Sequence, residues 1–299
     1  ISDLNDAETG LPLSYTGANA TGTTILNSTR AHRNTAIALK TRVYLVMGQY
    51  SNVITEASKI VSGTTTFQAP SGVANRLEAS VTTVFGGSYT GPEAILTFPY
   101  SSLDGPGGQS GGMAYYFTFT TGNAEYYLNT AATATASNPV FASGSADARR
   151  AFVAQQPANA TGLYWMNKFK TAATYHDYIP TIRYAETLLN YAEAAARQGN
   201  LALATNLLNA VRRRSHATYA FSASSINTQA ALISTILQER KIELLGEGFR
   251  TPDLLRLLQP IPGKVSAAAS AGSVPISAVS YVWPVSAAEL ASNKLALPN

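Results

Sequence analysis

The 299-residue sequence predicts an all-α protein in which helical hairpins stack into a superhelix within a single domain, residues 1–299. Three observations predict this fold. Apolar residues recur at helical spacing in three separate regions. Tight turns that contain glycine divide the first two regions into hairpins. The chain between and after these regions is rich in Gly, Ser, Thr and Pro, which favours loops. We therefore expect hairpins at 28–62, 179–216 and 227–258, a mostly loop insertion at 63–178 and an extended tail at 259–299.

The first two hairpins share one design. Gly48-Gln49-Tyr50 interrupts the first helical pattern, and Gly199-Asn200 interrupts the second, which runs from Ile182 to Gln198 and then from Leu201 to Arg213. Aligning the two regions places Gly48 over Gly199. We therefore expect the two glycines to occupy equivalent turns of hairpins that pack together.

The third region is strongly periodic over 227–245 and ends at Gly246. Thr251-Pro252-Asp253 then supplies an N-cap, a proline for the first helical turn and a carboxylate that complements the helix dipole. A short helix is expected to follow. Hairpins of roughly 34 residues are typical of tetratricopeptide (TPR) units.

The insertion and the tail differ in kind from the hairpins. The insertion carries few charges, and its short apolar pieces 94–98 and 115–119 are candidate strands. A long polar insertion on a helical scaffold is a frequent location of function. The tail is expected to wrap over the helices.

Composition excludes several classes of function. Charged residues make up 13% of the chain and its net charge is only +4, so nucleic acid is not an expected partner. There is no cysteine and there are three histidines, so we expect no disulfide, metal site or cofactor. No apolar run is long enough for a membrane helix. The chain begins with Ile1 and carries no signal peptide, which favours an N-terminally truncated fragment.

Charged residues on the helical segments are predicted to form structural ion pairs. Glu239, Glu243 and Glu247 are spaced four apart on one helical face, and two such carboxylates serve as acid and base in glycoside hydrolysis. Arginines placed to neutralise them would lower their pKa values and remove the general acid. We therefore predict buried pairs between helices and no catalysis. The predicted set is Arg183, Glu186, Glu193, Arg212, Glu239, Arg240, Glu243 and Arg250.

A serine hydrolase is a second, unfavoured enzyme hypothesis. Gly108 to Gly112 surrounds Ser110 in the pattern of a nucleophile elbow, and a histidine with Asp147 or Asp177 would complete a triad in name. The elbow needs a strand directly before the serine, whereas Gly and Pro precede it here. We therefore predict that the protein is not an enzyme.

Aromatic residues of the insertion are the candidate ligand contacts. Tyrosine and tryptophan present a flat apolar ring with a polar edge. Such a ring matches the C–H face of a sugar. The suggestive set comprises Tyr89, Tyr100, Tyr115, Tyr116, Tyr126, Tyr127, Tyr164, Trp165, Tyr175 and Tyr178, of which Tyr100, Tyr115, Tyr116, Tyr164 and Trp165 are the predicted ligand-binding residues.

Three segments carry a family resemblance when they are taken together. They are Ile182 to Glu186 continuing through Tyr191 to Ala194, Leu208 to Arg212, and Glu239 to Leu244 continuing through Glu247 to Arg250 with Asp253. In this order and spacing, the chain resembles the SusD/RagB family of outer-membrane nutrient-binding lipoproteins. Segments 147–150, 167–169 and 284–293 also resemble the family pattern.

The resemblance implies a function, a partner and a location. It implies non-catalytic binding of an oligosaccharide at the cell surface and delivery to a SusC-type TonB-dependent transporter. It also implies a lipid anchor in the outer membrane, on a cysteine that precedes the part of the family sequence matched here. A TPR-type protein-interaction scaffold is the alternative.

Overall fold

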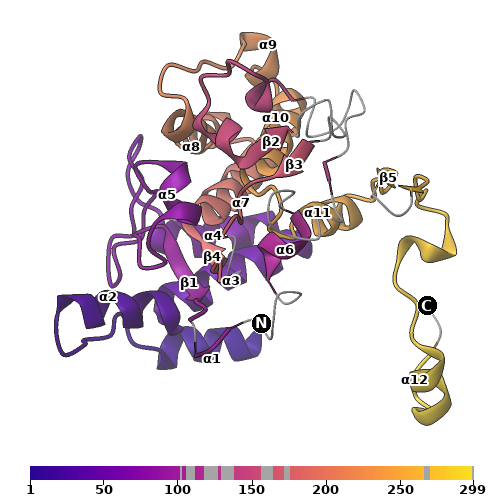
Figure 1. Ribbon diagram of the computed structural model, residues 1–299, viewed down its shortest axis with the longest axis horizontal. Coiled ribbons are helices and arrows are strands. Elements are labelled where there is room, and N and C mark those ends of the chain that lie inside the picture. Colours follow the sequence, from indigo (N-terminus) through magenta and orange to yellow (C-terminus); the bar gives the residue numbers. More distant parts are fainter. Residues whose placement is uncertain are drawn as a thin grey trace.

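The computed structural model describes residues 1–101, 103–105, 112–117, 127–128, 138–155, 164–171, 176–265 and 270–297. Helices dominate it and the strands form only small two-stranded sheets, so the predicted all-α class is confirmed (Figure 1). The α-helices are α1 (Ser2–Gly10), α2 (Ala20–Thr29), α3 (Arg33–Val46), α4 (Tyr50–Ile60), α5 (Val81–Gly86), α6 (Met113–Phe117), α7 (Tyr184–Arg197), α8 (Leu201–Ser215), α9 (Ala223–Ile226), α10 (Gln229–Glu243), α11 (Arg250–Arg256) and α12 (Ala287–Ser292).

The strands and 3-10 turns are short. The 3-10 turns are η3 (Pro139–Phe141), η4 (Ala148–Phe152) and η5 (Val279–Tyr281), and the strands are β1 (Ala94–Phe98), β2 (Val153–Gln155), β3 (Tyr164–Met166), β4 (Ile179–Arg183), β5 (Lys264–Val265) and β6 (Ser270–Ala271). The antiparallel pairs are β1 with β4, β2 with β3, and β5 with β6.

The first two hairpins have equivalent turns. Gly48 and Gly199 both have positive φ, 68° and 83°, which glycine adopts without steric cost. Each glycine N–H bonds to a carbonyl three residues earlier, and the next N–H bonds to a carbonyl five residues earlier, as in a Schellman motif. The α3–α4 and α7–α8 pairs also pack directly on each other, through α4 and α7. Both expectations for these hairpins are met.

Helix α7 lies at the centre of the fold. All its residues from Tyr184 to Ala196 are buried, because α3, α4, α8 and α10 surround it (Figure 1). The Tyr184 hydroxyl donates to the Ile60 carbonyl at 3.0 Å, and Asn190 Nδ2 donates to Thr41 Oγ1 at 3.1 Å. Hydrogen bonds therefore join the two hairpins across the apolar core.

The ends of the later helices differ from the sequence expectation in two places. Residues 182 and 183 belong to β4 and not to α7, because β1 pairs with this segment. Helix α11 begins at Arg250 after an N-cap at Phe249, so Thr251 is not its N-cap. Thr228 does cap α10, since its side chain accepts from the Ala231 N–H at 3.2 Å.

Of the two strands predicted in the insertion, one is correct and the other is wrong. Segment 94–98 forms β1, as predicted. Segment 115–119 was expected to be a strand, but its first three residues belong to α6, and residues 118 and 119 lie outside the described residues. Phe85, Phe152 and Phe169 pack edge to face with centroid distances of 5.3 and 5.9 Å. The insertion therefore has a small apolar core of its own.

The tail is attached to the helices only over its first part. The Tyr281 hydroxyl donates to the Gln259 carbonyl at 2.8 Å, and its ring is buried. Beyond this residue the chain extends away from the helical body, and α12 stands apart from it (Figure 1). The expectation that the tail wraps over the helices is wrong for this last segment.

Candidate functional site

The most extensive polar feature of the interior is a set of ten charged side chains, here called the buried charge network. Its five cations and five anions cancel in formal charge. Four members come from the insertion and six from the later strand, helices and loop. The members are Glu93, Asp147, Arg149, Lys168, Arg183, Arg212, Arg214, Glu239, Glu243 and Glu247.

Arg183, at the end of β4, is the centre of this network. Its Nη1 donates to Glu93 Oε1 at 2.8 Å and to Glu243 Oε1 at 2.7 Å. Its Nε donates to Glu247 Oε2 at 2.6 Å. One guanidinium therefore holds the entry to β1, the end of α10 and the loop that follows α10.

Arg149 joins the insertion to α10 in the same way. Its Nε and Nη2 form a two-point contact with the Asp147 carboxylate at 2.9 and 2.8 Å. Its Nη1 donates to Glu239 at 2.6 Å and to Glu243 at 3.0 Å. Since Arg149 is completely buried, its contacts fix the 3-10 turn η4 on the helical scaffold.

The pKa values within the network follow from burial and from the neighbouring charges. Burial alone would raise the pKa of Glu243, but Arg214, Arg183 and Arg149 hold it well below its usual range. Burial lowers the pKa of Lys168 to about 8, although Glu247 lies 2.7 Å away. The Glu243 carboxylate is therefore an ion at neutral pH and not a proton donor.

A second cluster of buried pairs connects α7, α10 and α11. Arg240 donates to Asp253 at 3.1 Å, and Arg256 donates to both oxygens of Glu193 at 2.8 and 2.6 Å. Separately, Arg42 donates to both carboxylate oxygens of Glu186. Seven of the eight side chains predicted for structural ion pairs are thus buried and ion-paired.

Arg250 is the exception. It was predicted to belong to a buried pair, but it is exposed at the first position of α11. Asp253, three residues after Arg250, forms its ion pairs with Arg240 and Arg256 instead. Arg250 therefore remains on the solvent side of this helix.

The charged residues considered as acid–base candidates are held by other side chains or by the backbone. The three glutamates on the predicted face are each held in an ion pair with arginine, and the pKa of Glu243 lies well below its usual range because of Arg214, Arg183 and Arg149. Asp147 is paired with Arg149, and Asp177 accepts from the N–H groups of residues 170 and 171. Ser110 lies outside the described residues. Within the described parts of the chain, no group of three or more His, Asp or Glu side chains could hold a metal ion.

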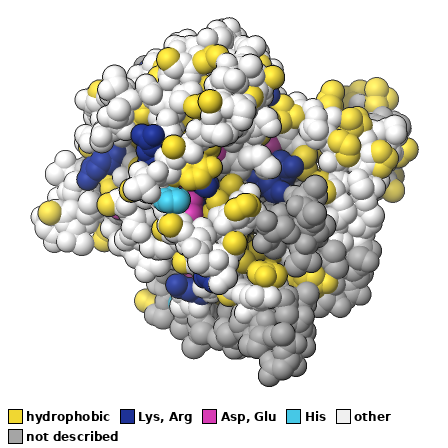
Figure 2. Space-filling model, turned by 90° about the horizontal axis from the view of Figure 1, so that it is seen from above, with side chains coloured by type: hydrophobic (Ala, Val, Ile, Leu, Met, Phe, Trp, Pro, Cys, Tyr) yellow, Lys and Arg dark blue, Asp and Glu magenta, His cyan; other side chains and the backbone are white. Residues whose placement is uncertain are grey.

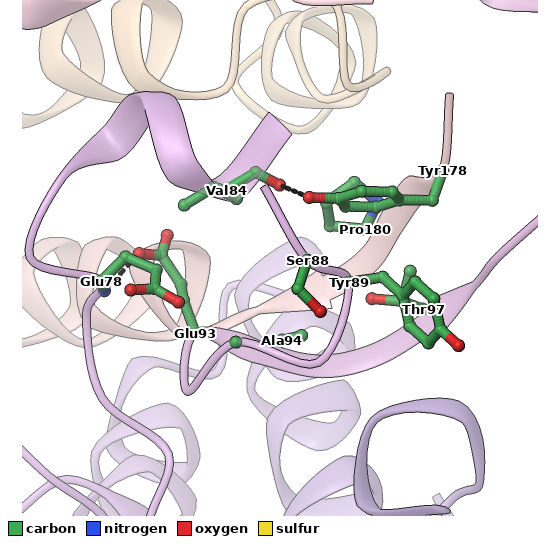
Figure 3. Close-up of a pocket in the computed structure, with 10 residues that line it drawn as sticks. Glu78, Val84, Ser88, Tyr89, Glu93, Ala94, Thr97, Tyr178 and Pro180 are labelled. Atoms are coloured by element: carbon green, nitrogen blue, oxygen red, sulfur yellow. Dashed lines mark hydrogen bonds between the residues drawn. The ribbon is translucent and has the colours of Figure 1, made fainter. Parts of the chain in front are cut away.

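A small pocket lies beside the buried charge network, where the loop after α5 crosses β1 and β4. It is a shallow hollow with a volume of about 10 Å³, which is room for about one water-sized group. Figure 3 shows the two carboxylates at one end, Tyr89 and Thr97 at the other, and Ser88 between them. The polar and aromatic lining consists of Glu78, Ser88, Tyr89, Glu93, Thr97 and Tyr178.

Both tyrosines of the pocket are held in place. Their rings meet edge to face with centroids 6.0 Å apart, and the Tyr178 hydroxyl donates to the Val84 carbonyl at 2.7 Å. Burial and the nearby Glu78 raise the pKa of Tyr178 to about 12. Tyr178 is therefore a neutral hydroxyl at physiological pH.

The five aromatic residues predicted to bind ligand do not line this pocket. The rings of Tyr115 and Tyr116 meet edge to face at 5.1 Å on α6, and Tyr100 is half-buried after β1. Trp165 on β3 is only 4% exposed and packs against Tyr127 at 5.6 Å, next to the half-buried Tyr164. Its ring faces are consequently shielded from solvent.

The sequence pointed to the two tyrosines of the pocket. It did not point to the charged residues that the insertion contributes to the buried charge network. Tyr89 and Tyr178 belong to the suggestive aromatic set, but Glu78 and Thr97 carry no sequence signal. Arg149, Lys168 and Glu93 were not predicted as ion-pair partners, because the residues that they contact on β4 and α10 lie 75 to 90 residues further along the chain.

The comparison with protein families decides what kind of chain this is. The SusD family model matches residues 47–295. The chain belongs to the SusD family. The match begins in the first hairpin and ends in the tail, so it includes the network, the pocket and both hairpin turns. Among curated proteins, none matches this chain.

Solved structures of the SusD superfamily share the fold. One from Bacteroides fragilis is 28% identical with a TM-score of 0.74, and the match covers 98% of this chain and 61% of that one. One from Bacteroides thetaiotaomicron is 22% identical with a TM-score of 0.74 and covers 100% and 64%. A surface glycan-binding protein from Bacteroides uniformis is 18% identical with a TM-score of 0.70 and covers 100% and 67%. The chain thus spans about two thirds of the length of these structures.

Proposed function

We propose that this SusD-family chain binds an oligosaccharide at the cell surface without changing it chemically. Family membership is the observation that carries the proposal. A protein of the same fold described as a surface glycan-binding protein supports it. The structure contributes a weakly charged exterior: Figure 2 shows scattered charged patches among mostly uncharged atoms on the face that is drawn. Such a surface suits a neutral, hydroxyl-rich ligand.

Binding without catalysis is consistent with the charged residues. Every carboxylate of the buried charge network has a cationic partner, and their contacts join structural elements. They are therefore committed to holding the insertion on the helices, and the ligand contacts must come from other side chains.

We propose that aromatic side chains of the insertion supply those contacts. The proposed set is Tyr100, Tyr115, Tyr116, Tyr164 and Trp165, in which Tyr115 and Tyr116 form a half-buried ring pair. A ring that covers one sugar face removes ~50–80 Å² of apolar surface from water, which contributes roughly 1–2 kcal/mol at ~25 cal/mol/Å². After the cost of association, two or three such contacts give micromolar to millimolar affinity.

The proposal extends to location and partner. We propose an outer-membrane, cell-surface location through a lipid anchor, and delivery of ligand to a SusC-type TonB-dependent transporter. Weak binding suits this role, because the ligand must be released again. In the part of the chain described here, no helix has the length and apolar character needed to cross a membrane.

A glycan array probed with the purified chain tests the proposal, followed by calorimetric titration of each glycan that is retained. We expect saturable binding of at least one oligosaccharide and its recovery unchanged after incubation. Binding of no glycan, together with capture of peptides, would favour the protein-interaction scaffold. Shortened glycan products would instead show a hydrolase.

A further inference from the structure

We propose that α5, α6, η3, η4, β2 and β3 form a structural unit, here called the docking unit, that separates from the helices around α7 while these helices stay folded. The unit lies against the end of α10 (Figure 1). Strand β3 carries Tyr164 and Trp165, so both residues move with the unit. The inference concerns the fold and its test needs no ligand, so it does not depend on the proposed function.

The docking unit has an apolar core that is distinct from the core of the helices. Phe85 on α5 packs edge to face with Phe152 at the end of η4 and with Phe169, which follows β3. Ala114 of α6 and Met166 of β3 belong to the same buried cluster. The cluster around α7 includes none of the described residues of these six elements. The two parts of the molecule therefore bury their apolar side chains separately.

The backbone of the unit makes no hydrogen bond to the central helices within the described parts of the chain. Strands β2 and β3 pair with each other, and the Asn167 N–H donates to the Phe152 carbonyl at 2.7 Å. The Phe141 N–H likewise donates to the Asn138 carbonyl at 2.9 Å. Among the described residues, separation from the helices therefore breaks no hydrogen bond between backbone groups.

Buried ion pairs attach the unit to the helices. Arg149 of η4 donates to Glu239 and Glu243 on α10 at 2.6 and 3.0 Å. Lys168, which follows β3, donates to Glu247 at 2.7 Å. Both cations are buried, and both belong to the buried charge network. The polar part of the boundary between the unit and the helices is therefore made by ions.

The apolar contacts across the same boundary centre on Ile242 of α10. It belongs to a small cluster whose other buried members, Val140, Phe141 and Val153, all belong to the unit. Leu245, which follows α10, packs on this cluster and on the core of the unit. Ile242 is therefore covered by the unit, and its side chain becomes accessible when the unit separates.

The ionic boundary makes separation easier than unfolding. An intact set of buried ion pairs contributes little net free energy, because each ion gives up its hydration when it is buried. Separation returns the ions on both sides to water, whereas unfolding of the helices also exposes the apolar core around α7. We therefore expect the unit to separate at a lower free energy than that of global unfolding, as local units of other proteins do.

Thiol labelling tests this expectation, because the chain contains no cysteine and each introduced thiol is the only one. Ile242→Cys reports separation of the unit, and Thr187→Cys, at a buried position of α7, reports unfolding of the helices. Ser58→Cys, on the exposed side of α4, gives the rate of an accessible thiol. We expect an excess of a maleimide to react at position 242 at least about 10-fold faster than at position 187. Equal rates at these two positions contradict the inference.

Two arginine variants, each made in the Ile242→Cys and Thr187→Cys backgrounds, test what attaches the unit. Arg149→Met removes an attaching cation and leaves buried carboxylates in excess, so we expect at least about 10-fold faster labelling at position 242. Arg256→Met is the matched control, because it removes a buried arginine that pairs with Glu193 within the helices whether or not the unit is attached. It should speed labelling at position 187 at least about 10-fold and leave labelling at position 242 unchanged.

The results that overturn the inference are distinct. Arg256→Met that speeds labelling by the same factor at both positions would show that the molecule opens only as one cooperative whole. Unchanged labelling at position 242 in Arg149→Met would show that this arginine does not attach the unit. Loss of the helical circular-dichroism signal in Arg149→Met also refutes the inference, because the helices are expected to stay folded without the unit.

Discussion

The Arg183 side chain contacts both the carboxylate and the backbone carbonyl of Glu243. Nη1 donates to Glu243 Oε1 and Nη2 donates to the Glu243 carbonyl, both at 2.7 Å, and both residues are buried. The carbonyl lies at the last residue of α10, where helical carbonyls lack an intrahelical partner. One arginine at the junction of β4 and α7 therefore neutralises the carboxylate of Glu243 and also satisfies the end of its helix.

The first prediction follows from this double contact. Arg183→Met should destabilise the fold by about 3–5 kcal/mol, because it leaves the five buried carboxylates of the network with four cations. Arg213→Met, at an exposed arginine of α8, should change the free energy of unfolding little. Urea denaturation of both variants measures the difference. Equal free energies of unfolding for the two variants would show that Arg183 and its ion pairs contribute no net stability.

A second prediction separates Glu239 from Arg250. Glu239→Ala removes a carboxylate that pairs with Arg149 at 2.6 Å and with Arg212 at 3.2 Å, so we expect a large loss of stability, on the order of 3–5 kcal/mol. Arg250→Ala removes an exposed side chain and should cost at most about 0.5 kcal/mol. Thermal unfolding of the two variants provides the measurement. A strong effect of Arg250→Ala would mean that it has a partner in solution.

This contrast shows what helical periodicity can and cannot predict. The spacing of Glu239 and Glu243 placed them on one face of α10, and the surplus of nearby arginines predicted their pairing correctly. The pattern around Arg250 was similar, but Asp253 pairs with Arg240 from α10 and with Arg256 three residues further along α11, so the local pattern did not show which arginine Asp253 would bind. The partners supplied by the insertion were likewise beyond local patterns.

The turns and short elements illustrate the same limit. Gly48 and Gly199 were predictable because a positive φ at a helix end selects glycine locally. Strand β1 was predictable from its apolar residues, whereas the aromatic run that begins at Tyr115 suits a strand by composition and forms α6 by tertiary packing. The pocket depends on β1 meeting the loop after α5, so only its tyrosines could be suggested in advance.

A third prediction concerns the two equivalent turns. Gly199→Ala and Gly48→Ala should each cost about 1 kcal/mol, because an L-residue is strained at positive φ, and nothing else obstructs the added methyl group at either position. Gly10→Ala, within α1 at an unobstructed position with no positive φ, should be neutral or slightly stabilising. Denaturation midpoints of the three variants test this. A loss at Gly10 equal to that at Gly199 would refute the conformational explanation.

A fourth prediction is a two-stage loss of stability in acid. Burial lowers the pKa of His32 to about 4 from 6.5, so the unfolded chain binds more protons than the folded one between these values. Stability should therefore fall as the pH drops from 6.5 to 4, by up to about 3 kcal/mol from this group. Glu243 and Glu193 have lowered pKa values, and the stability that they contribute is lost as the pH falls below 4.5.

The histidine and carboxylate contributions can be separated by mutation. His32→Gln should remove most of the pH dependence between 6.5 and 4.5 and leave the steeper loss below 4.5 in place. Urea denaturation at pH 7.5, 5.5 and 4.5 gives the free energies. An unchanged slope in the variant would assign the upper stage to other groups.

The last prediction tests the aromatic contacts of the proposed glycan site. Tyr115→Ala should lower affinity for the glycan found on the array by about 5- to 30-fold, which corresponds to the loss of roughly 1–2 kcal/mol of ring contact. Tyr115 is half-buried on α6 and meets Tyr116 edge to face, so its removal should leave the fold intact.

Trp165, the other residue of the proposed site to be tested, is different because it lies in β3 and is only 4% exposed. Trp165→Ala should therefore lower stability by about 3–5 kcal/mol. Trp165→Phe, which retains a ring on β3, should keep the fold, so calorimetric titration of this variant measures any contact with the ligand separately from stability. Affinities of Tyr115→Ala and Trp165→Phe equal to wild type, with both variants folded, would remove these two residues from the glycan site.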